Sequence, residues 1–273
     1  MKNTKNPPPR TTVTGSPRHT RRWAVITAGA ALLAACVLPS PAHAIVGGSE
    51  AAPGAFPSTV SIGRTSHSCG GVIISEDAVL TTAMCVAGTS ARTLHVRYGS
   101  NSHASGGNVV GVSGIISHPS YDSATHANDI ALLRTATPMT LGGTAQAASL
   151  APTSPPSLSE LTVAGWGETQ LDGSISPTLR QVTTRVVGDG VCQLLYGNDQ
   201  QISASMVCAG LRVAPRGFCF GDLGSPAYNP AKAVTALATW PSPDCNSLLK
   251  PDIYTAVAPY KNWILAQGVI LPA

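Results

Sequence analysis

The sequence predicts an all-β protein. Short runs of apolar and β-branched residues recur along the chain and are separated by Gly, Pro, Ser, Asn and Asp, a pattern typical of antiparallel sandwiches and barrels. The 273 residues include 27 glycines and 22 prolines, which favour many turns over long helices. Hydrophobic residues make up 43% of the chain, enough for a core and too many for a disordered protein.

The expected strands lie on both sides of a linker. They are residues 71–74, 94–98, 109–116, 130–134, 161–164, 179–187 and 234–240. Residues 147–159 are rich in Ala, Ser, Pro and Thr and predict a linker between two halves of similar size. Tyr260, Trp263 and Ile264 have helical spacing, so residues 258–267 are expected to form a terminal helix that packs on the core.

Residues 1–44 have the features of an export signal. A basic segment at 18–22 precedes an apolar run of 15 residues at 24–38, which is shorter than the roughly 20 residues that span a bilayer. Residues 42–44 form an A-x-A cleavage site. Cleavage there would leave 229 residues that begin at Ile45. No transmembrane span is predicted, and the leader together with the Ala, Gly and Thr bias suggests a bacterial exported protein.

Two alternatives stay open for this leader. Residues 20–23 weakly resemble a twin-arginine signal, although an ordinary basic segment gives the same pattern. Residues 33–36 resemble a bacterial lipoprotein cleavage box. That interpretation would place a lipid anchor on Cys36 and leave Ile45 inside the chain.

The charge balance argues against a nucleic-acid-binding protein. The formal net charge is +4, but six of the 17 basic residues and none of the 13 acidic residues lie in residues 1–44. Residues 45–273 therefore carry 11 bases against 13 acids, and no basic surface is expected on the mature chain.

Six of the seven cysteines follow the leader. An even number in an exported chain predicts disulfides formed in an oxidising compartment, and six cysteines allow 15 pairings. The chain has no C-x-x-C pair, so neither a metal site nor a cofactor is predicted.

Seven short motifs are spread along the chain after the leader. They are IVGG at 45–48, HSCGG at 67–71, NDIALL at 128–133, VAGWGET at 163–169, CAG at 208–210, GD-x-G-x-P at 221–226 and YKNWI at 260–264. In this order and spacing they resemble chymotrypsin/trypsin-like serine proteases. The resemblance implies two six-stranded antiparallel β-barrels, at about 45–150 and about 160–273, with a cleft between them. It also implies the disulfides Cys69–Cys85, Cys192–Cys208 and Cys219–Cys245.

The catalytic triad of this family is only partly present. Asp129, in NDIALL, matches the triad acid. Met84 stands where the family motif TAAHC has its histidine, and Leu223 stands where GDSGGP has its serine. Methionine has no proton that titrates near pH 7 and leucine has no nucleophilic atom, so neither supports the triad chemistry.

The sequence therefore predicts a secreted, catalytically inactive protease homologue, a monomer that binds an unknown protein or peptide partner. Two alternatives are an active trypsin-like serine endopeptidase, as the family resemblance alone implies, and a lipid-anchored surface protein of the same fold.

Other side chains near the predicted site could in principle replace the lost groups. Ser225 lies two residues beyond Leu223, but its hydroxyl is expected to point elsewhere. His126 is interpreted as a surface-loop residue near the cleft rim, and His67 as a structural residue near the Asp222 turn. The histidines outside any motif are expected to be exposed: His95, His103 and His118.

Some of the family machinery is retained. Asp222 matches the acid that pairs with the new N-terminus of a mature protease, and signal cleavage would make Ile45 that terminus without an activating protease. The backbone amides of Gly221 and Leu223 could still form an oxyanion hole, because backbone N–H groups do not depend on the side chain.

The expected primary specificity pocket departs from the family pattern. Its lining is predicted to be Gly217, Phe218, Thr239, Trp240, Pro241 and Asp252. Proline has no N–H, so one main-chain bond to a substrate is lost. The favoured interpretation has Phe218 plug the pocket and Asp252 solvated. The alternative is an open pocket that accepts a cationic group.

The replaced triad positions are expected to have a packing role. Met84 and Leu223 should fill the barrel interface as apolar side chains. Asp129 should become structural and accept hydrogen bonds from nearby backbone amides and from the Thr239 hydroxyl, since an unpaired buried carboxylate is costly.

Overall fold

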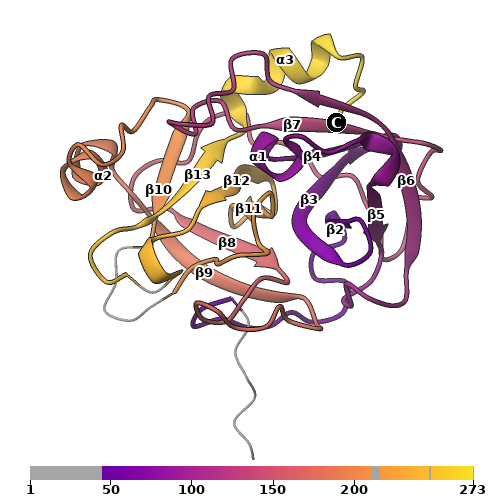
Figure 1. The fold of residues 1–273 in the computed structure, drawn as a ribbon, viewed down its shortest axis with the longest axis horizontal. Helices are drawn as coiled ribbons and strands as arrows, with labels where there is room; N and C mark the ends of the chain where they lie inside the picture. The colour runs from indigo at the N-terminus through magenta and orange to yellow at the C-terminus, as the bar shows by residue number, and fades with distance from the viewer. Residues whose placement is uncertain (1–44, 211–215, 246, 273) are drawn as a thin grey trace, which may run out of the picture. The chain divides into compact units, whose positions relative to one another are not determined.

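The computed structural model describes residues 45–210, 216–245 and 247–272, and these residues form thirteen strands and a few short helices. The signal-peptide and Cys36 predictions fall outside the described residues. The strands form two barrels (Figure 1), as predicted, and every strand pair is antiparallel.

The first barrel closes in the strand order β2-β3-β4-β7-β6-β5. Its strands are β2 (Thr59–Gly63), β3 (His67–Ser75), β4 (Ala78–Thr81), β5 (His95–Tyr98), β6 (Asn108–Ser117) and β7 (Ala131–Thr135). Strands β2 and β4 are buried along their whole length, whereas β5 alternates between buried and more exposed side chains. Alternation arises because successive side chains in a strand point to opposite faces.

The second barrel runs β9-β10-β13-β12-β11-β8 and closes through the β8–β9 pair, with β1 added at β9. Its strands are β8 (Glu160–Gly165), β9 (Arg180–Val187), β10 (Met206–Ala209), β11 (Pro226–Tyr228), β12 (Val234–Trp240) and β13 (Asp252–Ala256), and β1 is Ser49–Glu50. Residues 136–159 contain no strand, and the predicted linker lies within this stretch.

The helices are short and lie between or after the strands. They are α1 (Ala83–Val86), η1 (Ala91–Thr93), α2 (Asp189–Tyr196), η2 (Pro243–Cys245), η3 (Ala258–Tyr260) and α3 (Lys261–Ala266). The last two form the predicted terminal helix, and Ile264 is fully buried there. None of the helices among the described residues has the length and hydropathy needed to cross a membrane.

Three apolar clusters make up most of the core. One fills the first barrel around Val60, Ile73 and Leu133, and another fills the second barrel around Leu161 and Tyr254. The third combines residues of both barrels and the terminal helix, including Ile74, Leu132, Trp166, Leu237 and Ile264. The third cluster holds the two barrels together, so the side chains at their junction have fixed positions.

Three disulfides cross-link the described chain. They are Cys69–Cys85, Cys192–Cys208 and Cys219–Cys245, the pairs that the resemblance implied. Cys69–Cys85 ties β3 to α1, and each bond should stabilise the fold by about 3 kcal/mol, because it restricts the unfolded chain through the loop it closes.

Candidate functional site

The candidate site is built on a tight turn at residues 221–225. The Ser225 amide donates to the carbonyl oxygen of Asp222 at 2.8 Å, and the Gly224 amide donates to Ala238 of β12 at 2.8 Å. Gly221 and Gly224 have φ values of 88° and 80°, in the region that glycine adopts without strain. The turn therefore holds Leu223 at the junction of the barrels, where its half-buried side chain packs against both barrel cores.

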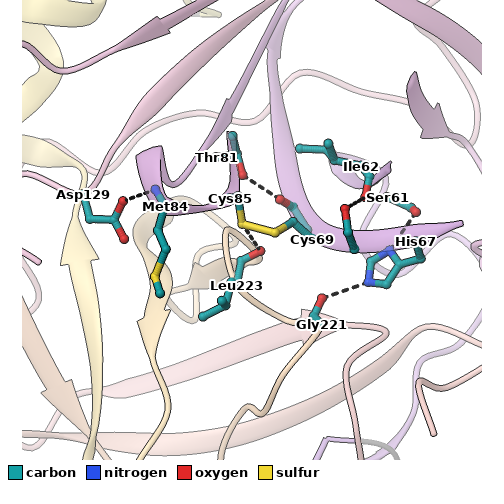
Figure 2. Close-up of a disulfide and its surroundings, with 12 residues drawn as sticks. Ser61, Ile62, His67, Cys69, Thr81, Met84, Cys85, Asp129, Gly221 and Leu223 are labelled. Atoms are coloured by element: carbon teal, nitrogen blue, oxygen red, sulfur yellow. Dashed lines mark hydrogen bonds between the residues drawn. A yellow bond between two sulfur atoms is a disulfide. The ribbon is translucent and has the colours of Figure 1, made fainter. Parts of the chain in front are cut away.

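Close contacts hold this turn against the first barrel. The Gly70 amide of β3 donates to the Leu223 carbonyl oxygen at 2.8 Å, and the Thr81 hydroxyl donates to the Gly70 carbonyl at 2.9 Å. The sulfur of Cys85 lies 3.3 Å from the Leu223 carbonyl oxygen (Figure 2). Sequence reasoning missed the supporting roles of Gly70 and Thr81, although both lie in or beside the motifs it used.

Met84 and Asp129 meet on the other side of Leu223. The Met84 amide, in α1, donates to Oδ1 of Asp129 at 2.8 Å, while the Met84 side chain is half-buried (Figure 2). Asp129 is fully buried, and among the described residues its Oδ2 has no hydrogen-bond partner. Burial raises the pKa of Asp129 to about 6, despite the backbone donors.

The expected bond from Thr239 to Asp129 is wrong. The Thr239 hydroxyl is bonded to the Thr255 hydroxyl at 2.8 Å and donates to the Leu237 carbonyl at 3.2 Å. The Thr239 hydroxyl therefore bonds to groups of β12 and β13. Asp129 is left with backbone donors alone.

The Ser225 side chain lies in the packing between β3 and β8. It is fully buried, and its hydroxyl has no partner among the described residues. A Cβ added to Gly70 would lie 2.0 Å from this hydroxyl oxygen, and one added to Gly165 would lie 2.7 Å from it. The two glycines leave just enough space for the serine, and the hydroxyl has no access to a ligand.

His67 bridges β2 and the 221–225 turn. Its Nε2 lies 2.8 Å from the Gly221 carbonyl oxygen and its Nδ1 lies 2.8 Å from the Ser61 hydroxyl. A carbonyl can only accept, so Nε2 carries the proton and Nδ1 accepts from Ser61. Burial lowers the pKa of His67 to about 4, which keeps the ring neutral and structural.

Of the other histidines in the described residues, one is exposed and three are half-buried. His126 is half-buried and its ring lies edge-on to Trp240, with centroids 4.5 Å apart. His95 is exposed, as expected. The expectation of exposure is wrong for His103, which packs against His67, and for His118, which packs against Tyr260 and Trp263 of the terminal helix.

The residues of the expected specificity pocket are mostly buried. The Phe218 ring is fully buried and packs edge-on against Tyr254, with centroids 5.0 Å apart, inside the second barrel. The expectation that Asp252 is solvated is wrong, because Asp252 is fully buried. Its carboxylate accepts from the Phe218 amide at 3.2 Å and from the Ser242 amide at 2.8 Å.

The strand that precedes this pocket leads from Thr239 to Pro241. Thr239 and Pro241 are buried and Trp240 is half-buried. On the other side, Gly217 pairs with Val46, close to the predicted mature terminus. Of the expected pocket residues, Phe218 is bonded to Asp252 through its amide, and its ring packs beside Tyr254.

Asp222 and Ile45 both lie inside the second barrel. Asp222 is fully buried and accepts from the Gly167 amide at 2.7 Å and the Cys219 amide at 3.2 Å. Burial raises its pKa to about 7. Ile45 is fully buried in the cluster that includes Phe218, but its nitrogen is an amide in the uncleaved chain. No cluster of His, Cys, Asp and Glu among the described residues could hold a metal ion.

Comparison with known proteins identifies the family. The family model described as Trypsin matches residues 45–264. The chain belongs to the trypsin family. It is 42% identical to Trypsin Blo t 3 of Blomia tropicalis over 82% of this chain and 86% of that protein, and 34% identical to Trypsin alpha-4 of Lucilia cuprina over 82% and 87%.

A solved structure agrees with this assignment. The structure titled neuropsin, a serine protease expressed in the limbic system of mouse brain, matches this trypsin-family chain with a TM-score of 0.76 and 27% identity. The match covers 82% of this chain and all of the neuropsin chain. The family and the two-barrel fold are therefore established.

Proposed function

We propose that this trypsin-family chain is a secreted, catalytically inactive protease homologue that binds a protein or peptide partner. The observation that carries the proposal is the environment of Asp129. Where the family motif has a histidine, Met84 supplies only a backbone amide to Asp129, and Oδ2 has no partner among the described residues. Where the motif has a serine, Leu223 presents a carbon side chain that packs against both barrels.

Chemical reasoning supports a loss of hydrolysis. The triad needs a base to take the proton of a hydroxyl, and neither a thioether nor an isobutyl group can act in that pair. Removal of a triad costs about a millionfold in turnover in a protease that has the same triad on an unrelated fold. Buried Ser225 does not replace the lost hydroxyl, because it lies in the packing between two strands.

The cleft also disfavours a substrate bound as an extended strand. Pro241 has no N–H to donate to a peptide, and the burial of the Phe218 ring against Tyr254 supports a plugged primary pocket. The amides of Gly221 and Leu223 remain as an oxyanion-hole remnant. A partner that docks through its surface, with no peptide threaded into the pocket, fits this arrangement better.

Export of the chain is part of the proposal. Three disulfides among the described residues fit an oxidising compartment. N-terminal sequencing of the exported protein separates the two leader interpretations. A terminus at Ile45 supports secretion, and an acylated Cys36 supports the lipid-anchored alternative.

The competing function is active trypsin-like endopeptidase activity, which membership of the trypsin family favours. A fluorophosphonate probe distinguishes the two on the intact protein, because it labels an activated serine. We expect no mass increase. An adduct that disappears in Ser225→Ala would overturn the proposal, as would cleavage of a broad peptide library that depends on Ser225 or His126.

Reconstruction of the triad tests the same site from the other direction. Met84→His, Leu223→Ser and Ser225→Gly together restore the family motifs, and the new imidazole would give the unpartnered Oδ2 of Asp129 a donor. We expect peptide hydrolysis to emerge in this triple variant or after addition of Pro241→Gly. Activity in the quadruple variant alone would identify the proline as a second block.

A further inference from the structure

A cavity of about 380 Å³ lies on the first barrel beside His67. It is lined by the end of β2, the turn that follows, the start of β3, strand β5 and the loop after β5. Five of its lining residues are basic or imidazole side chains, and none is Asp or Glu; the five are Arg64, His67, His95, Arg97 and His103.

The strand geometry explains why these side chains converge. His95 and Arg97 are two residues apart on β5, so they share one face, while Val96 is buried on the other. The β2–β5 register places Arg97 opposite Ser61, and Ser61 is hydrogen-bonded to His67. His103, from the loop after β5, packs its ring 5.4 Å from that of His67.

Among the described residues, no Asp or Glu lines this cavity or forms an ion pair with its arginines. Arg97 donates through Nε to the His103 carbonyl at 3.1 Å and through Nη1 to the Gly106 carbonyl at 2.5 Å. These carbonyls orient the guanidinium without cancelling its charge, and they use two of its five N–H groups. Arg64 is exposed and has no hydrogen bond or ion pair within the described part of the chain.

We propose that this cavity binds a small oxyanion, carried on a carboxylate-, sulfate- or phosphate-bearing ligand, through Arg64, Arg97 and His103. Guanidinium groups recognise oxyanions with paired, charge-assisted hydrogen bonds, and a concave site of this volume suits a small molecule. Both ring nitrogens of His67 are already bonded, to Ser61 and Gly221, so the ligand would contact the other basic side chains of the cavity and not His67. The site does not depend on whether the cleft is catalytic.

Titration of the exported protein with sodium sulfate tests this site. Calorimetry at constant ionic strength, set with sodium chloride, should show saturable binding. We expect Arg64→Gln to weaken sulfate binding about tenfold, as befits one charge-assisted contact. Arg92→Gln is the matched control, because Arg92 is an exposed arginine on η1 outside the cavity, and it should bind sulfate like the wild type. Inorganic phosphate and citrate, titrated in parallel, distinguish the possible anion sources.

A pH series gives a second readout. Burial and the nearby Arg97 lower the pKa of His103. Sulfate keeps its charge between about pH 5 and pH 8, so tighter binding at the acidic end would report proton uptake by the cavity. Arg64, Arg97, His67 and His95 are the other basic or imidazole groups that line the cavity, and His67, with a pKa of about 4, stays neutral over this range. His103→Gln should therefore flatten the pH dependence.

The inference is overturned if sulfate, phosphate and citrate all fail to saturate the wild type. Equal weakening in Arg64→Gln and Arg92→Gln also overturns it, because that result would show general charge attraction. The exposed Arg64 side chain makes no hydrogen bond to any residue that the structure describes, so its substitution should leave the melting curve unchanged. A change in sulfate binding can then be assigned to the lost guanidinium.

Discussion

At the scale of one residue, the side chain at position 84 affects the hydrogen bonding and the pKa of Asp129. Its Oδ1 accepts from the Met84 amide, but Oδ2 is buried without a partner in the described structure. A histidine at position 84 would place a donor there. With methionine instead, burial dominates and the pKa of the carboxyl rises to about 6.

This pKa predicts that Asp129 costs stability near neutral pH. The folded state binds a proton more tightly than the unfolded chain, so the free energy of unfolding falls as pH rises from about 4 to about 6. Asp129→Asn removes this loss, because asparagine does not ionise. We expect the change that Asp129→Asn makes to the free energy of unfolding to be more favourable at pH 7 than at pH 4, by up to about 3 kcal/mol.

Urea unfolding at both pH values measures the effect. Asp172→Asn is the matched control, because Asp172 is exposed and has positive φ, which asparagine also tolerates. A pH-independent difference between wild type and Asp129→Asn would contradict the prediction.

At the scale of an element, the 221–225 turn depends on glycine for two separate reasons. Gly224 has a φ of 80°, and a Cβ there would lie 2.2 Å from the Thr81 hydroxyl and 2.4 Å from the Gly70 carbonyl oxygen. The turn and β3 can therefore approach closely only without a side chain at this position. This close approach also allows the Gly70 amide to donate a hydrogen bond to the Leu223 carbonyl.

Gly224→Ala should accordingly destabilise the protein by about 3 kcal/mol or more, because it adds backbone strain and a clash with backbone atoms. Gly190→Ala should have the opposite sign. Gly190 is an exposed residue of α2, and no atom lies within 4 Å of a Cβ added there. Alanine should therefore stabilise that helix by about 0.5–1 kcal/mol. Denaturant unfolding of the two variants compares them, and a similar change in both would contradict this account.

At the scale of the whole molecule, signal cleavage between Ala44 and Ile45 is expected to stabilise the second barrel. Ile45 and Asp222 are both fully buried there, and burial raises the pKa of Asp222 to about 7 in the uncleaved chain. A free ammonium on Ile45 would compensate that buried charge. The proposed pair needs signal cleavage alone and no separate activation step.

A chain that begins at Ile45 should therefore be more stable than the same chain with one added N-terminal residue, by about 3–5 kcal/mol near pH 7. The difference should grow between about pH 4 and pH 7, because Asp222 in the extended chain loses its stabilising proton over that range. Thermal unfolding measures it. Asp222→Asn should abolish most of the difference, and its persistence would exclude this pair.

The two-barrel fold could be predicted because its signals are local and repeated. Residues 234–240 were expected as a strand and form β12 with those bounds, and the terminal helix lies where Tyr260, Trp263 and Ile264 have helical spacing. The short motifs also brought Met84, Asp129 and Leu223 to attention. Residue identity and spacing along the chain are sufficient for such inferences, since a strand period or a motif is contained in a few consecutive positions.

Partners between distant segments could not be predicted in this way. Thr239 is bonded to Thr255 and not to Asp129, and Asp252 is buried against the Phe218 and Ser242 amides. His103 lies on His67 because the loop after β5 returns to the start of β3. The sequence by itself determined the family, the strands and the chemistry that Met84 and Leu223 lack. Only the tertiary structure decided which polar groups are paired, because hydrogen bonding and burial depend on backbone groups that fold together from far apart in the chain.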